Sequence, residues 1–209
     1  MPVSPTSFGA IDIPTPPAPR GRRVGLMGGS FNPPHAGHRL AAEEALQRLG
    51  LDELWWIVTP GNPLKSHGDL KPLTDRLTAV RAMALDPRMR VTSFEAALGS
   101  PYTAVTLQFL KRRYPTVRFV WVMGADNLAT FHRWQDWRGI AAAMPIAVVD
   151  RPDHRLPALA SKTAKALERL RIPEAKARAL ATMPPPAWVF LTNPLAPHSS
   201  TAIRQAADS

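Results

Sequence analysis

The stretch GGSFNPPHAGH at residues 28–38 decides how this chain folds. It follows apolar residues 24–27, typical of a buried strand, and leads into an Ala/Leu/Glu-rich segment typical of a helix. His35 and His38 then share one face of the first helical turn, beside backbone N–H groups that have no intrahelical partner. Gly28 and Gly29 let the chain turn and let a ligand approach the backbone. Because a helix N-terminus attracts anionic phosphate, the string predicts a phosphate-binding loop.

The composition indicates one soluble α/β domain. The chain has 209 residues, 45% of them hydrophobic, and no apolar run long enough to span a bilayer. It has no cysteine, which excludes disulfides and thiolate chemistry and suits a reducing cytoplasm. The formal net charge of +10 suits nucleic acid, an anionic membrane or polyphosphate ligands. Much of that charge falls on apparent helix faces, so we expect a solvated surface and no membrane or nucleic-acid partner.

The first 22 residues differ in composition from the rest. Six prolines fall within the first twenty positions, without periodicity and without the features of a signal peptide. We therefore expect a flexible, disordered Pro-rich N-terminal tail over residues 1–22 and a single domain over residues 23–209.

Strands and helices alternate from residue 24 onward, which predicts a mostly parallel sheet with helices on both faces. The expected strands are residues 24–27, 53–59, 89–94, 117–123, 145–149 and 188–191. The expected helices are residues 36–48, 74–85, 103–114, 126–142, 161–181 and 199–207. In such a sheet, ligands bind beyond the carboxyl ends of the strands, where the strand order switches. The glycine string does not match GxGxxG, which disfavours a dehydrogenase domain.

Two strings resemble the signature motifs of the nucleotidyltransferase superfamily. Residues 35–38 resemble its HxGH motif, and residues 199–204 resemble its ISSTxIR motif, with His198 in place of the usual Ile. The resemblance implies a Rossmann-like nucleotidyltransferase fold, with His35, His38 and Arg204 as catalytic residues. The residues it assigns to ATP are Gly28, Gly29, Ser30, Phe31, His35, Gly37, His38, Ser199, Ser200, Thr201 and Arg204.

Further segments at strand ends resemble the bacterial nicotinate mononucleotide adenylyltransferases. The family patterns NPxK, SYTxxTL, GxDxL and a following Trp match this chain, although Pro101 stands where Ser is common. The residues that the resemblance assigns to nicotinate mononucleotide are Asn62, Lys65, Tyr102, Thr103, Asp126 and Trp134. Trp134 suits stacking on a pyridine ring, whereas Asp126 suits either ribose hydroxyls or a helix cap. We expect Trp55, Trp56 and Trp121, inside strands, to pack in the core.

The reaction implied by the resemblance is transfer of the adenylyl group of ATP to nicotinate mononucleotide, a step of NAD biosynthesis. Mg²⁺ is expected on the ATP phosphates and no metal site in the protein, since the two histidines lack an obvious third ligand. A related transferase acting on another phosphate acceptor, such as phosphopantetheine, is one alternative. A basic nucleic-acid-binding protein is the alternative from another class, but no recognised binding motif supports it. Both a monomer and a homodimer remain open.

Overall fold

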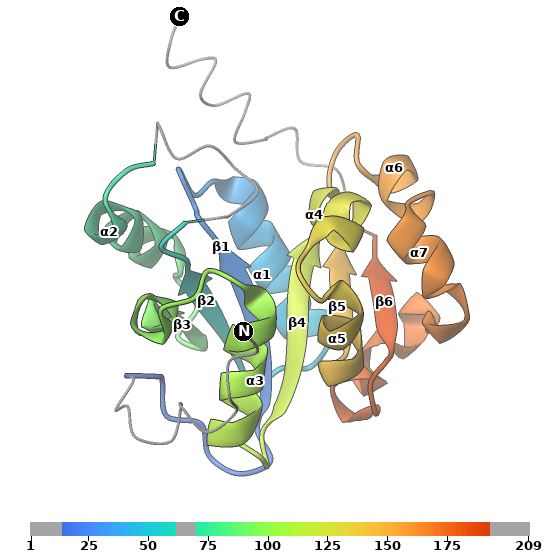
Figure 1. Cartoon of the computed structure of the whole chain (residues 1–209), viewed down its shortest axis with the longest axis horizontal. Helices are drawn as coiled ribbons and strands as arrows, with labels where there is room; N and C mark the ends of the chain where they lie inside the picture. The colour runs from blue at the N-terminus through green and yellow to red at the C-terminus, as the bar shows by residue number, and fades with distance from the viewer. Residues whose placement is uncertain (1–13, 62–69, 193–209) are drawn as a thin grey trace, which may run out of the picture.

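The structure is a computed structural model, and it describes residues 14–61 and 70–192. In these ranges the chain forms a six-stranded sheet with helices on both faces (Figure 1). The strands are β1 (Arg23–Gly29), β2 (Glu53–Val58), β3 (Met89–Thr92), β4 (Arg118–Gly124), β5 (Ile146–Val149) and β6 (Trp188–Leu191). The α-helices are α1 (Ala36–Arg48), α2 (Leu73–Met83), α3 (Thr103–Arg113), α4 (Ala125–Thr130), α5 (Trp137–Ala143), α6 (Arg155–Leu159) and α7 (Lys162–Ala166). The 3-10 helices are η1 (Phe94–Leu98), η2 (Phe131–Arg133), η3 (Glu168–Leu170) and η4 (Glu174–Thr182).

The strand order is β3-β2-β1-β4-β5-β6, and every pair is parallel. The order therefore reverses between β1 and β4, whose register pairs Val24 with Phe119 and Leu26 with Trp121. This is the strand order of a doubly wound dinucleotide-binding sheet. The prediction of a Rossmann-like parallel sheet is confirmed, and the crevice expected to bind ligands lies at the carboxyl ends of β1 and β4.

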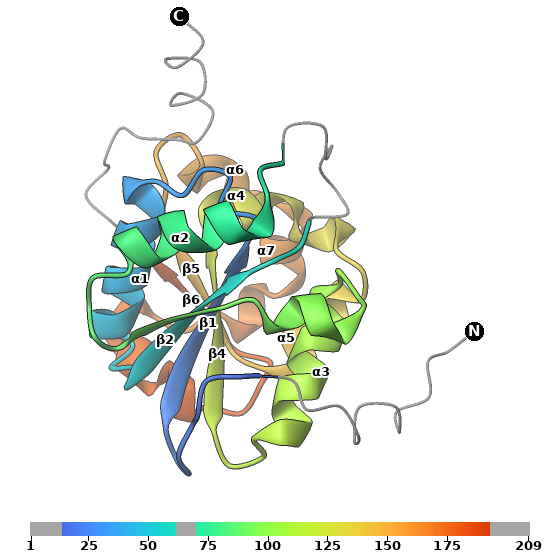
Figure 2. The same cartoon turned by 90° about the vertical axis from the view of Figure 1, so that its left-hand side faces the viewer.

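Each face of the sheet carries its own hydrophobic core. Alternate residues point to opposite faces of a strand, so on β4 Phe119 and Trp121 join one core and Val120 and Val122 join the other. Helices α3, α4, α5, α6 and α7 contribute to the first core, and α1, α2 and η4 contribute to the second. Figure 2 shows α1 and α2 on one side of the sheet, with α3 and α5 on the other. Burial of both faces explains the near-continuous apolar strands of the sequence.

The helix predicted over residues 126–142 is wrong as one element. The structure divides it into α4, η2 and α5, with a break at residues 134–136. Asp136 adopts a left-handed conformation, with φ of 52°, and its side chain accepts a hydrogen bond from the Gly139 N–H at 3.2 Å. The Asp136 carboxylate thus starts a new helix where the sequence pattern suggested continuation.

The helix predicted over residues 161–181 is also wrong as one element. It divides into α7, η3 and η4, and Pro173 immediately precedes η4. Proline has no N–H to donate and disfavours helical backbone in the residue before it. Ile172 instead donates its N–H to the Trp188 carbonyl at 2.8 Å, beside a bridge between Arg171 and Trp188. The segment therefore leaves the helix to extend the edge of the sheet next to β6.

Residues 14–22, which the sequence assigns to the tail, lie against the domain where the structure describes them. The Tyr114 hydroxyl donates to the Pro16 carbonyl at 2.9 Å and contacts the Thr15 hydroxyl. Gly21 donates its N–H to the Thr116 carbonyl at 3.1 Å. In the described part of the chain, contacts with the domain are therefore already present at Thr15 and Pro16, within the segment predicted as a tail. The helix predicted over residues 199–207 lies outside the described residues.

In the described part of the chain, no helix is long and apolar enough to cross a membrane.

Candidate active site

The two histidines of the glycine string meet at the N-terminus of α1. His35 is the N-cap residue and accepts the Gly37 N–H at Nδ1, at 3.1 Å. His38 accepts the His35 N–H at its own Nδ1, at 3.3 Å, and the ring centroids lie 3.8 Å apart. A neutral imidazole that accepts at Nδ1 carries its proton on Nε2. Both rings are thereby held in the tautomer that carries its proton on Nε2. His38 is half-buried, whereas His35 is 2% exposed and its Nε2 is buried.

The chain turns at Phe31, not at the glycine pair as the sequence suggested. Gly28 and Gly29 are the last residues of β1, whereas Phe31 has a φ of 46°. The left-handed region is strained for a bulky side chain, at about 1–3 kcal/mol. The ring of Phe31 is buried against Trp56 and His38, with centroids 5.2 and 5.1 Å away. Tertiary packing of this ring thus holds the turn that delivers the two histidines.

The glycine pair is needed because other groups approach it closely. A Cβ added to Gly28 would lie 2.6 Å from Cη2 of Trp121, on the neighbouring strand β4. A Cβ added to Gly29 would lie 3.1 Å from the Phe31 ring. The glycines therefore make room for two aromatic side chains as well as for a ligand.

A cavity of about 370 Å³ opens beside the glycine pair, at the carboxyl ends of β1 and β2 and over β4. This volume is in the range of small-molecule binding sites. The lining residues are Gly28, Gly29, Thr59, Gly61, Glu95, Pro101, Tyr102, Thr103, Trp121, Arg133, Trp134, Gln135 and Ile140. Gly28, Gly29, Tyr102, Thr103 and Trp134, all assigned from the sequence, thus come together. Thr59, Glu95, Arg133 and Gln135 were not identified from the sequence.

An aromatic wall closes one side of this cavity. Trp134 packs edge-on against Phe131 and Trp121, with ring centroids 5.3 and 6.3 Å away. As expected, Trp55, Trp56 and Trp121 are buried in the cores. Trp121 has a second role that the sequence did not reveal, because it also lines the cavity. Trp137, by contrast, packs on Phe131 and is not among the lining residues.

Glu95, in η1, places a carboxyl group in the wall of the cavity. It is 3% exposed, and its Oε1 accepts a hydrogen bond from the Thr106 hydroxyl of α3 at 2.5 Å. Oε2 is buried without a hydrogen-bond partner in the described structure. Burial raises the pKa of Glu95 from 4.5 to about 7, while the Thr106 hydrogen bond opposes that rise. Near neutral pH this wall therefore holds a carboxyl group that is only partly ionised.

Comparison with known proteins identifies the family of this chain. Residues 26–206 match the model of the cytidylyltransferase-like family. A probable nicotinate-nucleotide adenylyltransferase of Agrobacterium fabrum is 58% identical over 181 residues, covering 87% of this chain and 97% of that protein. A protein of the same description from Methylorubrum extorquens is 56% identical over 182 residues, covering 87% and 98%. The chain belongs to the nicotinate-nucleotide adenylyltransferase family.

The fold is also that of a solved structure. Plasmodium falciparum nicotinic acid mononucleotide adenylyltransferase, complexed with NaAD, matches with a TM-score of 0.64 and 15% identity. The match covers 88% of this chain and 83% of the other.

Asp126, a residue assigned through the family's GxDxL pattern, lies just beyond β4 in the first turn of α4. Its Oδ1 is 3.3 Å from Nε of Arg151, which follows β5. The short α4 helix has Gly124 as its N-cap, so Asp126 is not a capping residue. The ion pair sits beside the switch in strand order, although Asp126, His35 and His38 are not among the residues that line the cavity.

The remaining predicted site residues fall outside the described part of the chain. They are Asn62, Lys65, Ser199, Ser200, Thr201 and Arg204. Among the residues that are described, no group of three or more His, Asp or Glu side chains could hold a metal ion.

Proposed function

We propose that this protein transfers the adenylyl group of ATP to nicotinate mononucleotide, forming nicotinate adenine dinucleotide and pyrophosphate. One observation carries the proposal: the aromatic-walled cavity and the histidine pair share the glycine end of β1. A pyridine mononucleotide in the cavity and ATP at the start of α1 would then meet over one short loop. The relatives from Agrobacterium and Methylorubrum, named for this activity, support the assignment.

The chemistry requires alignment more than proton transfer. An oxygen of the mononucleotide's 5′-phosphate attacks the α-phosphorus of ATP, a new P–O bond forms, and the bond to pyrophosphate breaks. The attacking phosphate is already largely ionised at neutral pH, so no general base is needed. Catalysis then consists of holding the two phosphates in line and neutralising charge on the transferred group and the leaving group.

His35 and His38 are suited to that neutralisation. Backbone N–H groups occupy both Nδ1 atoms, so each neutral ring directs an Nε2–H donor, and the α1 N-terminus adds its partial positive charge. Mg²⁺ on the ATP phosphates remains a prediction, and such an ion would be held mainly by phosphate oxygens and water. When bound, that ion neutralises phosphoryl charge. Arg204 and residues 199–201 remain predicted contacts to the β- and γ-phosphates.

The start of α3 supports recognition of a carboxylate on the pyridine ring. Tyr102 is the N-cap of this 11-residue helix, and both Tyr102 and Thr103 line the same cavity as Trp134. The first N–H groups of a helix favour an anionic group over a neutral amide. We therefore expect nicotinate mononucleotide to be used in preference to nicotinamide mononucleotide.

The test is dinucleotide formation by the purified protein with ATP and Mg²⁺. Nicotinate mononucleotide, nicotinamide mononucleotide and phosphopantetheine are supplied in parallel reactions, and the products are separated by chromatography. A higher kcat/KM for the nicotinate form supports the proposal in full. Equal use of both refutes the role of the α3 N-terminus, and product with phosphopantetheine alone refutes the acceptor.

A further inference from the structure

Arg76, in the first turns of α2, is a buried cation with an unusual set of partners. It is 3% exposed, and each of its hydrogen bonds in the described structure ends on a backbone carbonyl. Nη1 donates to Ser30 at 2.8 Å and to Thr59 at 2.7 Å. Nη2 donates to Pro60 at 3.2 Å, and Nε donates to Lys71 at 2.9 Å. One guanidinium thus joins three separate segments of the chain.

Two of these segments build the candidate active site. Ser30 lies between Gly29 of the cavity wall and the turn that delivers His35. Thr59 and Gly61 line the cavity at the end of β2, on either side of Pro60. The glycine loop therefore carries the residues proposed for ATP, and the β2 end carries part of the mononucleotide cavity. Arg76 connects the glycine loop to the end of β2 from outside the cavity, since its own side chain is not among the lining residues.

Neighbouring contacts reinforce the same connection. The Thr59 N–H donates to the Gly29 carbonyl at 3.0 Å, and the Lys71 N–H donates to Oδ1 of Asn32 at 3.2 Å. Burial lowers the pKa of Arg76 from its ordinary value, yet arginine stays protonated at working pH. A planar fork with five donors fixes both distance and angle between its acceptors, which an ammonium group cannot do. The geometry is therefore specific to arginine.

We propose that Arg76 is a positioning residue that sets the glycine loop and the end of β2 in the mutual arrangement that adenylyl transfer requires. It acts through the carbonyls of Ser30, Thr59 and Pro60 and does not touch either substrate. This proposal rests on the proposed function for its catalytic readout. Its structural part, the locking of the two segments, is independent of the substrate.

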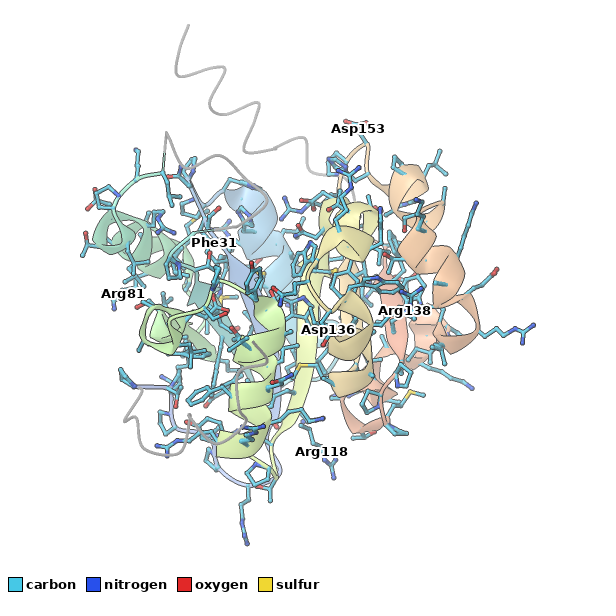
Figure 3. All side chains as sticks on the ribbon, viewed as in Figure 1. Phe31, Arg81, Arg118, Asp136, Arg138 and Asp153 are labelled. Atoms are coloured by element: carbon cyan, nitrogen blue, oxygen red, sulfur yellow. The ribbon has the colours of Figure 1, made fainter. Side chains whose placement is uncertain are left out.

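The experiment compares Arg76→Lys and Arg76→Ala with Arg81→Lys and Arg81→Ala. Arg81 lies on the same helix, exposed on the outer side of α2 (Figure 3), so it controls for losing an arginine from α2. The melting temperature of each variant is measured first, and kcat and both KM values are then measured well below it. We expect Arg76→Lys to stay folded with kcat lowered on the order of 10- to 100-fold, as for a small misplacement of reacting groups. The Arg81 variants should keep wild-type kinetics.

Two further measurements separate positioning from simple stability. Added guanidinium ion should restore part of the kcat of Arg76→Ala and leave Arg81→Ala unchanged. Hydrogen exchange of the Thr59 amide, which bonds to Gly29, should accelerate in both Arg76 variants, with or without enzymatic activity. A wild-type kcat in folded Arg76→Lys would overturn the positioning role. So would a loss of kcat in the Arg76 variants that is no larger than their unfolded fraction explains. An inactive wild-type protein whose Thr59 amide still depends on Arg76 would instead overturn the proposed function alone.

Discussion

Replacing Glu95 by glutamine should change how stability depends on pH. The carboxyl group is buried in the cavity wall, and its pKa is raised from 4.5 to about 7 because burial disfavours the charged form. Between these two pH values the folded protein binds more protons than the unfolded chain does. The free energy of unfolding must therefore fall as pH rises through this window, and the loss is complete above pH 7.

The magnitude follows from the difference between the two pKa values. A difference of about 2.5 between 7 and 4.5, at 1.36 kcal/mol for each pH unit, amounts to about 3 kcal/mol. Most of this falls between pH 5 and pH 8. Glutamine keeps an oxygen to accept the Thr106 hydroxyl but cannot ionise, so Glu95→Gln should lack the loss. The free energy of unfolding of the variant, relative to that of wild type, should therefore increase by about 3 kcal/mol as pH rises across the window.

The assay is urea unfolding followed by tryptophan fluorescence, at half-unit steps from pH 5 to pH 8.5 for both proteins. Groups with lowered pKa, such as Asp52 beside Arg23, are common to both and cancel in the difference. Parallel stability curves across this range would refute the reasoning, since they would mean that Glu95 titrates as an ordinary carboxyl.

The ionisation of Glu95 should also change substrate binding. Ionised Glu95 in the cavity wall should raise the KM for the nicotinate-bearing substrate above pH 7 in wild type only.

Four further substitutions test the site and its support. His38→Ala removes one phosphate donor, so kcat should fall about 100-fold or more while circular dichroism shows an intact fold. Trp134→Ala removes a stacking surface of the cavity and should raise the KM for the mononucleotide about tenfold, with the KM for ATP unchanged. Gly28 and Gly25 both lie in β1, and an added Cβ would lie 2.6 Å from Trp121 and from Leu51, respectively. Gly28→Ala and Gly25→Ala should therefore each lower the free energy of unfolding by about 1–3 kcal/mol in denaturant unfolding. Only Gly28→Ala, which displaces Trp121 at the cavity, should also raise that KM.

The layout of the sheet could be predicted because its strands are continuous apolar runs separated by helical segments. Helix α1 was predicted at its observed bounds, and Gly50, with a φ of 61°, follows its C-cap residue Leu49. The breaks at Asp136 and Pro173 were missed because helical periodicity continues across both positions. Each break depends on a partner: Gly139 for the Asp136 carboxylate, and β6 for the segment before Pro173. Asp136 and Pro173 therefore interrupt helices that the helical periodicity predicts correctly on either side of each residue.

For the site, motif residues were predictable and supporting residues were not. His35, His38 and Trp134 stand in strings whose spacing carries information. Glu95 and Arg76 are a lone acid on a 3-10 turn and a lone arginine on a helix, residue types that usually face solvent. Their importance arises only when the fold buries them against Thr106 or against carbonyls from distant segments.

At Gly28, the sequence motif and the packing seen in the structure explain different parts of one residue's role. The sequence suggested a glycine that lets the chain turn, but its backbone is that of an ordinary strand residue. Its lack of a side chain matters because Trp121 crosses from β4 and would meet a Cβ at 2.6 Å. Trp121 in turn supports the edge of Trp134, the ring expected to stack on the pyridine. A glycine that belongs to the phosphate string therefore also shapes the cavity for the second substrate, which couples the two half-sites through packing alone.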